Sequence, residues 1–458
     1  METAYRVAVI GAGLAGCECA SGLSAMGVEC TLFEMKPLKF SPAHRNPDLA
    51  ELVCSNSLRS DDPRSAAGEL KREMRALGSL CLEAAELSRV PAGKALAVDR
   101  AAFSRIVTER IAANPRIRLI RREIRSLEPA REPALAGFSH LALTAGPLAG
   151  EDLSSSLAGT AGARHLYFYD AIAPVVSGDS LEMENIFQGS RYSDAAGDYL
   201  NCPLTREEYL AFHQALLEAE KTPAHAFEQE KHFEGCLPLE AMAERGEKTL
   251  LFGPFKPVGL RDPRTGRRPF ALVQLRAENL NRDMFNLVGC QTKLLHREQE
   301  RVFRLIPGLR RAEFVRYGSM HRNTYIDAPA VLREDLSLRA APHIFLAGQI
   351  TGVEGYVESA ACGLWLGLSL GAALTGRPLP PPPAESALGG LLAHLRAPAK
   401  RFQPSNAQYG LTPELEKEAE TARRAAGGEK KSRSLLYAER AEAAFARWRA
   451  LCAPETTA

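Results

Sequence analysis

Three glycines and one acidic residue near the start of the chain have the spacing of a pyrophosphate site. Gly11, Gly13 and Gly16 form the pattern G-x-G-x-x-G. Glu34 follows the last glycine at the spacing, roughly 20 residues, that dinucleotide-binding folds have. The first glycine allows a tight turn, the second lets a pyrophosphate approach the backbone, and the third lets a helix pack closely on a strand. The acid bonds a ribose hydroxyl in such folds. The predicted cofactor-binding residues here are Gly11, Ala12, Gly13, Leu14, Ala15, Gly16 and Glu34. A glycine turn that binds nothing is the alternative.

Two of the ten cysteines, Cys54 and Cys236, lie in turn-rich, polar segments that suit a reactive thiol. A thiolate is a strong nucleophile near neutral pH, especially where its pKa is lowered. Both cysteines are therefore candidate catalytic residues, and ordinary burial is the competing interpretation for each. Other cysteines fall in helix or strand patterns and are predicted to be buried: Cys17, Cys19, Cys30 and Cys362.

A strand–turn–helix unit must position the glycines and the acid. Residues 7–10 are a short apolar run, which predicts a buried parallel strand. A helix of small residues should continue to Met26 and end at Gly27. A second strand over 29–33 should then finish in Glu34. The segment 35–58 begins where this strand ends and carries Cys54, so we expect it to be a loop over the cofactor.

A second strand–turn–helix unit occurs late in the chain. Residues 344–350 have the buried-strand pattern, a glycine-rich turn follows, and an apolar helix should run through Leu374. This arrangement places helix N-terminal amides against an anion or a flavin edge. Its candidate cofactor-binding residues are Gly348, Gln349, Gly352, Gly355 and Tyr356. Tyr356 could stack near a flavin or pack in the core.

Between these two units the sequence becomes rich in aromatic, polar, glycine and proline residues, which indicates an insertion. Residues 117–120 and 141–144 are predicted strands, and helices are expected over 68–77 and from Asp99. A capped helix is expected from Thr205, followed by glycine- and proline-rich loops. We therefore predict an α/β fold in which a Rossmann-like cofactor-binding domain is split by an inserted α+β domain. The predicted bounds are 1–190 and 290–400 for the two parts, 191–289 for the insertion, and 401–458 for a tail with a basic helix.

Composition restricts the functional class only loosely. The chain has 458 residues, of which 45% are hydrophobic and 24% charged, and a net charge of +2. These values are ordinary for a soluble globular protein and do not indicate a nucleic-acid binder, so any RNA site must be a local patch. No stretch approaches the length of a membrane span, and the first strand leaves no room for a signal peptide. The cysteines form no C-x-x-C pair and should be reduced in a cytosol.

Several longer strings are more specific than the glycine motif. Among them are GAGLAG, AELVCSNSLRS, VPAGKALAVDR, FEGCLP, FGPFKPVGL, EFVRYGSMHRNTY and AGQITGVEGYVESA. Together they resemble the TrmFO family of folate-dependent tRNA (uracil-5-)-methyltransferase flavoproteins, and the match runs from Ile10 to about Gly410. The chain departs from the usual family string VGFQTHL at Cys290 and Lys293. Some relatives methylate a ribosomal RNA uridine, so this departure bears on the RNA target.

The resemblance implies FAD in the split Rossmann-like domain, reduction by NADH or NADPH, and 5,10-methylenetetrahydrofolate as the carbon donor. The implied product is ribothymidine in the T-loop of tRNA, and the resemblance also implies that Cys54 and Cys236 are catalytic. We further expect a cytoplasmic protein with no metal, no membrane association and no obligate protein partner. We favour Cys236 as the thiolate that attacks uracil C6. Cys54 would then protect or help to transfer the one-carbon unit that the flavin carries.

Further residues are weaker candidates, each with a structural alternative. A basic loop could contact phosphates through Lys256, Arg261, Arg267 and Arg268, or could simply be solvated. The string RYGSMHRNTY could line a folate or uridine pocket through Arg316, His321, Arg322 and Asn323, or could hold its own loop. A related flavoprotein that modifies wobble uridines, a disulfide oxidoreductase and a non-catalytic RNA-binding protein are the rival functions. The short tail, the missing C-x-x-C pair and the near-neutral charge count against them respectively.

Overall fold

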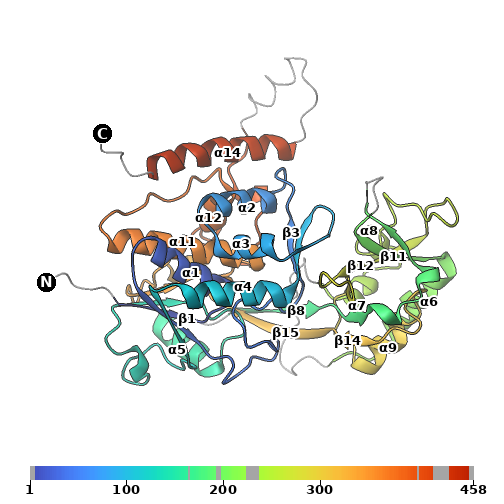
Figure 1. Cartoon of the computed structure of the whole chain (residues 1–458), viewed down its shortest axis with the longest axis horizontal. Helices are drawn as coiled ribbons and strands as arrows, with labels where there is room; N and C mark the ends of the chain where they lie inside the picture. The colour runs from blue at the N-terminus through green and yellow to red at the C-terminus, as the bar shows by residue number, and fades with distance from the viewer. Residues whose placement is uncertain are drawn as a thin grey trace, which may run out of the picture.

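A computed structural model describes residues 6–162, 166–191, 197–222, 237–399, 402–415 and 433–452. In the described parts, the chain forms two lobes joined by a long two-stranded ribbon (Figure 1). Cys236 lies outside the described residues, as do Lys430 and Lys431 of the predicted basic tail.

The first lobe is built on a parallel five-stranded sheet with the strand order β16-β7-β1-β2-β6. Its central strand β1 pairs in parallel with both β2 and β7. The side chains of β1 are buried throughout, as expected for a strand covered on both faces. The strands are β1 (Val7–Ile10), β2 (Cys30–Glu34), β6 (Ile117–Arg121), β7 (His140–Leu143) and β16 (Ile344–Leu346). These positions confirm the predicted α/β class and both strand–turn–helix units.

Two helices, α1 (Leu14–Ala25) and α11 (Tyr356–Leu374), pack against each other through small residues. A Cβ on Gly363 would lie 2.1 Å from the Ala15 carbonyl oxygen, and one on Gly367 would lie 2.2 Å from that of Cys19. The backbones therefore approach too closely for any side chain at these glycines. Among the described residues, α11 is the one helix long and apolar enough to cross a membrane, but 83% of its most apolar window is buried inside the protein. The expectation that no stretch has this length was wrong, because the core of the cofactor lobe needs a long apolar helix.

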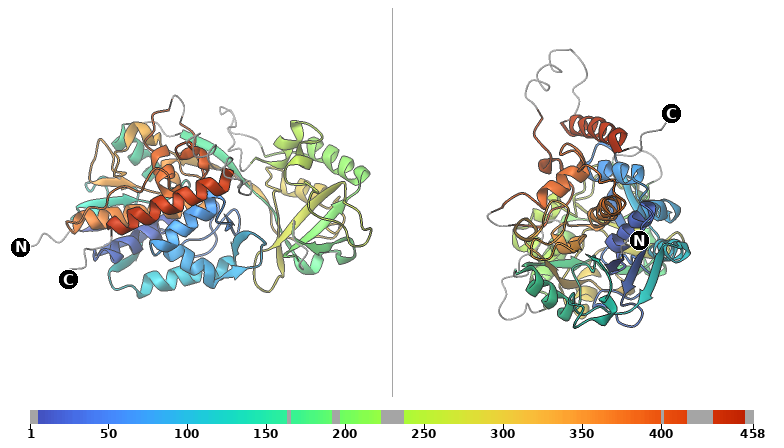
Figure 2. Two further views of the ribbon diagram at one scale, coloured as in Figure 1. Left: turned by 90° about the horizontal axis from the view of Figure 1, so that it is seen from above. Right: turned by 90° about the vertical axis from the view of Figure 1, so that its left-hand side faces the viewer.

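The remaining elements of the first lobe cover this core. A small antiparallel sheet has the order β3-β5-β4, and the C-terminal helix α14 lies across α2 and α12 (Figures 1 and 2). Trp448 of α14 packs on Trp365 of α11 with ring centroids 6.0 Å apart. The strands are β3 (Ser57–Ser60), β4 (Arg89–Val90) and β5 (Ala95–Val98). The helices are α2 (Ala66–Ala76), α3 (Leu80–Leu87), α4 (Arg100–Ala113), α5 (Glu151–Ala161), α10 (Ala328–Val331), α12 (Ala387–His394) and α14 (Arg433–Cys452).

The second lobe is a six-stranded sheet with helices, in the order β10-β11-β12-β13-β9-β14. Its strands are β9 (Val175–Ser177), β10 (Phe187–Gly189), β11 (Tyr199–Leu204), β12 (Ala271–Ala277), β13 (Met284–Leu287) and β14 (Phe314–Arg316). Its helices are α6 (Arg206–Glu218), α7 (Leu239–Glu244), α8 (Thr249–Phe252) and α9 (His296–Phe303). Thr205 caps α6 in a capping box with Glu208, as the sequence predicted.

The sheet of the second lobe extends beyond the predicted insertion of 191–289 on both sides. It begins at Val175 and ends at Arg316, because β9 and β14 complete one edge of the sheet. The ribbon between the lobes consists of β8 (Leu166–Ile172) and β15 (Ser319–Tyr325), paired antiparallel. Short 3₁₀ turns occur at Pro133–Leu135, Gly178–Ser180, Met183–Asn185, Gln349–Thr351 and Tyr409–Leu411.

Candidate active site at the cofactor pocket

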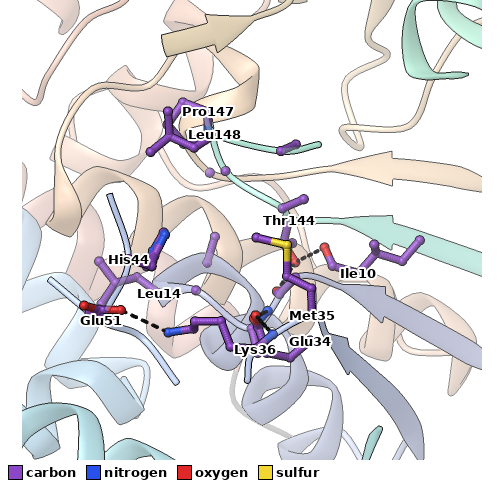
Figure 3. Close-up of a pocket in the computed structure, with 18 of the residues that line it drawn as sticks. Ile10, Leu14, Glu34, Met35, Lys36, His44, Glu51, Thr144, Pro147 and Leu148 are labelled. Atoms are coloured by element: carbon purple, nitrogen blue, oxygen red, sulfur yellow. Dashed lines mark hydrogen bonds and ion pairs between the residues drawn. The ribbon is translucent and has the colours of Figure 1, made fainter. Parts of the chain in front are cut away.

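A pocket opens at the carboxyl ends of β1 and β2, where the glycine motif turns into α1 (Figure 3). The close-up shows Glu34, Lys36 and Glu51 on one side of the pocket and Pro147 and Leu148 on the other. It is lined by nine of the predicted cofactor residues: Gly11, Ala12, Gly13, Leu14, Ala15, Glu34, Gly348, Gln349 and Tyr356. Ligands of open α/β sheets bind at this end of the strands.

The three motif glycines meet different surroundings. Gly11 has φ +98°, and a Cβ there would lie 2.5 Å from Cα of Ala145. A Cβ on Gly16 would lie 1.8 Å from the carbonyl oxygen of Gly11, so Gly16 serves the packing of α1 on β1. At Gly13, by contrast, a Cβ would have no neighbour within 4 Å. Gly13 therefore borders open space at the start of α1, where the first amides of a helix have no intrahelical acceptor.

Glu34 is buried at the end of β2 and is held by two backbone amides. Its Oε2 accepts a hydrogen bond from the Ala12 amide and its Oε1 accepts one from the Lys36 amide, both at 2.9 Å. Each carboxylate oxygen has a second lone pair, so Glu34 keeps the capacity to accept from a ribose hydroxyl. The arrangement fixes the carboxylate at the wall of the pocket.

Three predicted residues do not line the pocket, and their surroundings give steric reasons for glycine. Gly16 packs as described above. Gly352 has φ +93°, and a Cβ there would lie 2.4 Å from the ring of Phe402. Gly355 has φ +112° and precedes α11, where a Cβ would lie 2.3 Å from Oε2 of Glu358. Glycine at these positions supports the backbone of the site.

The loop that carries Cys54 covers the pocket, as the sequence predicted. Val53, Glu51 and His44 of this loop line the pocket. The Nζ atom of Lys36 holds the loop by donating to the carbonyl oxygen of Asn46 at 3.0 Å and by pairing with Glu51 at 3.3 Å. Burial lowers the pKa of the His44 imidazole, which favours its neutral form.

Cys54 lies beside the pocket and contacts Tyr356, the first residue of α11. The Cys54 Sγ atom is 2.9 Å from the Tyr356 hydroxyl oxygen, which also accepts a hydrogen bond from the Cys54 amide at 2.7 Å. Tyr356 is also one of the residues that line the pocket. Burial and the nearby Cys54 raise the pKa of the Tyr356 hydroxyl well above its usual value, so it stays protonated.

The segment after Cys54 joins the two lobes. Arg276 of β12 donates from Nε to the side-chain oxygen of Asn56 and from Nη2 to the Ser55 hydroxyl, both at 2.8 Å. The fully buried Asn56 amide donates to the carbonyl oxygens of Val98 and Ala277, one from each lobe. Cys54 is thus held at the place where the second lobe contacts the cofactor lobe.

The cysteines that the sequence assigned to the core are buried. Burial raises the pKa of the Cys30 thiol to about 12 and that of Cys362 to about 11. It raises the pKa of the Cys17 and Cys19 thiols still further. These four thiols are buried and stay protonated, as structural cysteines do, whereas Cys54 is partly exposed.

The weaker candidates separate into two groups. Arg316 reaches the Cys54 loop, where its Nη1 donates to the carbonyl oxygen of Val53 at 3.1 Å. Asn323 is buried in β15, and the side chains of His321 and Arg322 lie outside the described residues. The basic loop lies between α8 and β12, is not among the residues that line the pocket, and has three exposed members: Arg261, Arg267 and Arg268. Lys256 of this loop is partly buried.

The two departures from the family string lie beside α7. Cys290 is fully buried, and its pKa is raised by that burial. Lys293 donates from its backbone amide to Glu240 of α7, which the neighbouring Thr292 hydroxyl also contacts. The helix α7 begins three residues after Cys236 in the sequence.

Sequence reasoning missed the far wall of the pocket, residues 144–150. Thr144 donates from Oγ1 to the carbonyl oxygen of Gly11 at 2.8 Å and so braces the glycine turn. The string after β7 gave a partial signal, because a strand followed by Thr-Ala-Gly resembles the strand-and-ATG element of flavoproteins. No group of three or more His, Cys, Asp or Glu side chains able to hold a metal ion occurs among the described residues.

Comparison with known proteins agrees with this geometry. The family model for glucose inhibited division protein A matches residues 6–378. The methylenetetrahydrofolate–tRNA-(uracil-5-)-methyltransferase TrmFO of Oleidesulfovibrio alaskensis is 63% identical over 98% of both chains. The protein of the same name from Geobacter sulfurreducens is 53% identical, over 96% of this chain and 98% of its own. 

Solved structures of Aquifex aeolicus GidA have a similar fold. The form I crystal structure matches with a TM-score of 0.65 at 14% identity, covering 98% of this chain and 80% of that one. The form II structure matches with a TM-score of 0.63 at 15% identity, covering 86% and 67%. At this identity the likeness concerns the fold, a Rossmann-like α/β domain with a second lobe.

Proposed function

The chain belongs to the TrmFO family of methylenetetrahydrofolate–tRNA-(uracil-5-)-methyltransferases, and we propose that it methylates C5 of a uridine in tRNA with 5,10-methylenetetrahydrofolate as the carbon donor. The identity of 63% over 98% of the chain carries this conclusion. The position of Cys54 beside a dinucleotide-type pocket supports it. Ribothymidine in the T-loop is the proposed product, NADH or NADPH the proposed reductant, and the cytoplasm the proposed location.

The pocket residues fit FAD. The open space at Gly13, the amides at the start of α1 and the buried carboxylate of Glu34 suit a pyrophosphate and a ribose. Gly348, Gln349 and Tyr356 would border the other end of the cofactor. When bound, FAD supplies hydride and one-carbon transfer chemistry that no amino-acid side chain provides. The chain's own residues bind and orient it.

Cys54 and Cys236 supply the part of the chemistry at uracil that amino-acid side chains can perform. We infer that the Cys236 thiolate adds to C6, which makes C5 nucleophilic. C5 then bonds the one-carbon unit of the folate, the C5 proton leaves, and the bond from the transferred carbon to its nitrogen carrier breaks to give an exocyclic methylene. A hydride that originates in NAD(P)H adds to this methylene as the Cys236 thiolate is eliminated from C6, which leaves the methyl group. Cys54 acts on the cofactor side of the same site, consistent with its contact to Tyr356.

Covalent trapping tests the division of labour between the two cysteines. A tRNA with 5-fluorouridine at the target position cannot lose a proton from C5, so a thiolate adduct should persist after carbon transfer. Cys236→Ala should bind FAD and tRNA but form no adduct, whereas Cys54→Ala should lose turnover with a different trapping behaviour. Cys362→Ala is the matched control, because its thiol is buried in α11. Normal methylation by Cys236→Ala would remove the nucleophile assignment, and adduct loss only in Cys54→Ala would reverse the roles.

A ribosomal RNA uridine is the alternative target, and the departures at Cys290 and Lys293 are the observation that raises it. Unmodified tRNA and unmodified ribosomal RNA should be offered separately, with folate and NADH or NADPH, and the methylated nucleoside mapped. Methylation of the T-loop uridine alone supports the proposal. Methylation confined to ribosomal RNA would assign the alternative.

A further inference from the structure

The loop that carries Cys54 is surrounded by more buried positive charge than its neighbours neutralise. Three guanidinium groups reach residues 52–56: Arg100 from α4, Arg276 from β12 and Arg316 from β14. Glu278 pairs with Arg100, the Nε atom of Arg100 lying 2.5 Å from Oε2. Of these three guanidinium groups, Arg100 is the one that forms an ion pair with a carboxylate of the described residues, and that carboxylate is Glu278.

Arg316 has the most incomplete hydrogen bonds of these three guanidinium groups; the Nε atom of Arg100 also lacks a hydrogen-bond partner but forms an ion pair with Glu278. The Nη1 atom of Arg316 donates to the Val53 carbonyl oxygen, but its buried Nε and Nη2 atoms have no hydrogen-bond partner among the described residues. Burial lowers the pKa of Arg316 to about 10, so the group remains protonated near neutral pH. A buried cation with open donors is costly unless an anion lies beside it. Three neighbouring groups that can carry negative charge act on Arg316: Glu278, Tyr356 and Cys54. Glu278 is engaged by Arg100, and burial keeps the Tyr356 hydroxyl protonated, which leaves Cys54 as the anion that can balance Arg316.

The hydrogen bonds of the Tyr356 hydroxyl also favour an anionic Cys54. Its oxygen accepts the Cys54 amide at 2.7 Å and lies 3.4 Å from the Ser55 amide, which together occupy both of its lone pairs. The hydroxyl hydrogen is then left for the Cys54 sulfur at 2.9 Å. A thiolate accepts such a hydrogen bond much better than a thiol does.

We propose that Arg316 is a positioning residue that holds Cys54 as a thiolate, with the Tyr356 hydroxyl as its hydrogen-bond donor and the thiol proton released to solvent. The other charged groups facing the segment support this state: Arg100 and Arg276 are cations, and Glu278 is engaged by Arg100. Because Arg316 comes from β14 of the second lobe, the thiolate depends on contact between the two lobes. The proposal rests on the proposed function only in giving Cys54 a reactive role.

Alkylation of Cys54 tests the proposal without any methylation assay. Flavin-loaded protein is treated with iodoacetamide near neutral pH, and the alkylation rates of the Cys54 and Cys452 peptides are followed by mass spectrometry. Cys452 is the internal reference, because it is a partly exposed thiol whose pKa is raised by burial. Arg316→Gln should slow alkylation of Cys54 by about tenfold or more, the effect of removing an opposite charge that shifts the pKa of a nearby ionisable group by about one unit or more. The rate for Cys452 should not change.

Two further variants separate electrostatics from structure. Arg316→Lys keeps the charge and should restore most of the Cys54 rate. Arg311→Gln removes a charge from an 86% exposed arginine of the same lobe and should leave the rate unchanged. Equal Cys54 rates in Arg316→Gln and the wild type would overturn the proposal. Should Arg316→Gln not fold, wild-type Cys54 reacting no faster than Cys452 would overturn it equally.

Discussion

Gly13→Val should separate cofactor binding from folding, because Gly13 is the motif glycine with free space around it. Its backbone has φ −72° and ψ −169°, which residues other than glycine adopt readily, and a Cβ there has no neighbour within 4 Å. The new side chain therefore meets only the space that the pyrophosphate needs. We expect a folded protein without flavin.

The expected magnitudes differ widely between the two properties. Losing glycine at a helix N-cap costs about 1 kcal/mol, and thus a few degrees in Tm. Excluding the pyrophosphate from the start of α1 removes roughly two charge-assisted hydrogen bonds of about 1.5–3 kcal/mol each. This loss weakens FAD binding by about 10²–10⁴-fold. Gly16→Ala should instead destabilise the fold itself, because its Cβ would lie 1.8 Å from the Gly11 carbonyl oxygen and would disrupt the packing of α1.

The assay is the flavin absorbance of the purified protein, with FAD titration and thermal unfolding of the apoprotein. Gly159→Val in α5 is the matched control, because a Cβ there also has no neighbour within 4 Å but the residue lies away from the pocket. The control should be yellow. A Gly13→Val protein with full flavin content would refute the assignment of the pyrophosphate site. A Gly13→Val protein that fails to fold would refute the claim that the space at Gly13 is free.

Three other outcomes are expected. Cys362→Ala should keep full activity and lose only about 1 kcal/mol of stability, measured by urea unfolding, because its thiol is buried filler. Tyr356→Phe should keep the ring but lose the hydroxyl that contacts Cys54, so turnover should fall while flavin content stays unchanged; unchanged turnover would exclude a role for this contact. Burial raises the pKa of Glu18 from its usual 4.5 to about 7, so the protonated form favours the folded state. The free energy of unfolding should therefore fall by about 3 kcal/mol as pH rises from about 4.5 to 7, and this fall should be absent in Glu18→Gln.

The sequence predicts most of the cofactor site because local rules determine it. The run from Val7 to Gly16 combines an apolar strand, a glycine turn and a helix of small residues, and each part has a local pattern. Glu34 follows from its place at the end of the next strand. The inert cysteines also follow from local patterns, since each lies in a helix or strand whose neighbours are apolar.

Other features depend on contacts between distant segments, which no local pattern reports. Gly352 and Gly355 belong to the same glycine-rich pattern as the pocket residues. They must be glycine, however, because a Cβ would collide with Phe402 at the first position and with Glu358 at the second. The sheet of the second lobe extends past the predicted insertion because β9 and β14 pair with strands that are distant in the sequence, and no local pattern reports such pairing. Likewise, the approach of Arg316 to Val53 joins residues 263 positions apart.

The origin of the transferred carbon tests the central claim most directly. Unmodified tRNA should be incubated with the flavin-loaded protein and reduced nicotinamide, with isotopically labelled methylenetetrahydrofolate in one reaction and labelled S-adenosylmethionine in another. Nucleoside analysis should find the label in 5-methyluridine from the folate reaction alone. Label that arrives from S-adenosylmethionine, or a tRNA that remains unmethylated with folate while FAD is bound, would contradict the account.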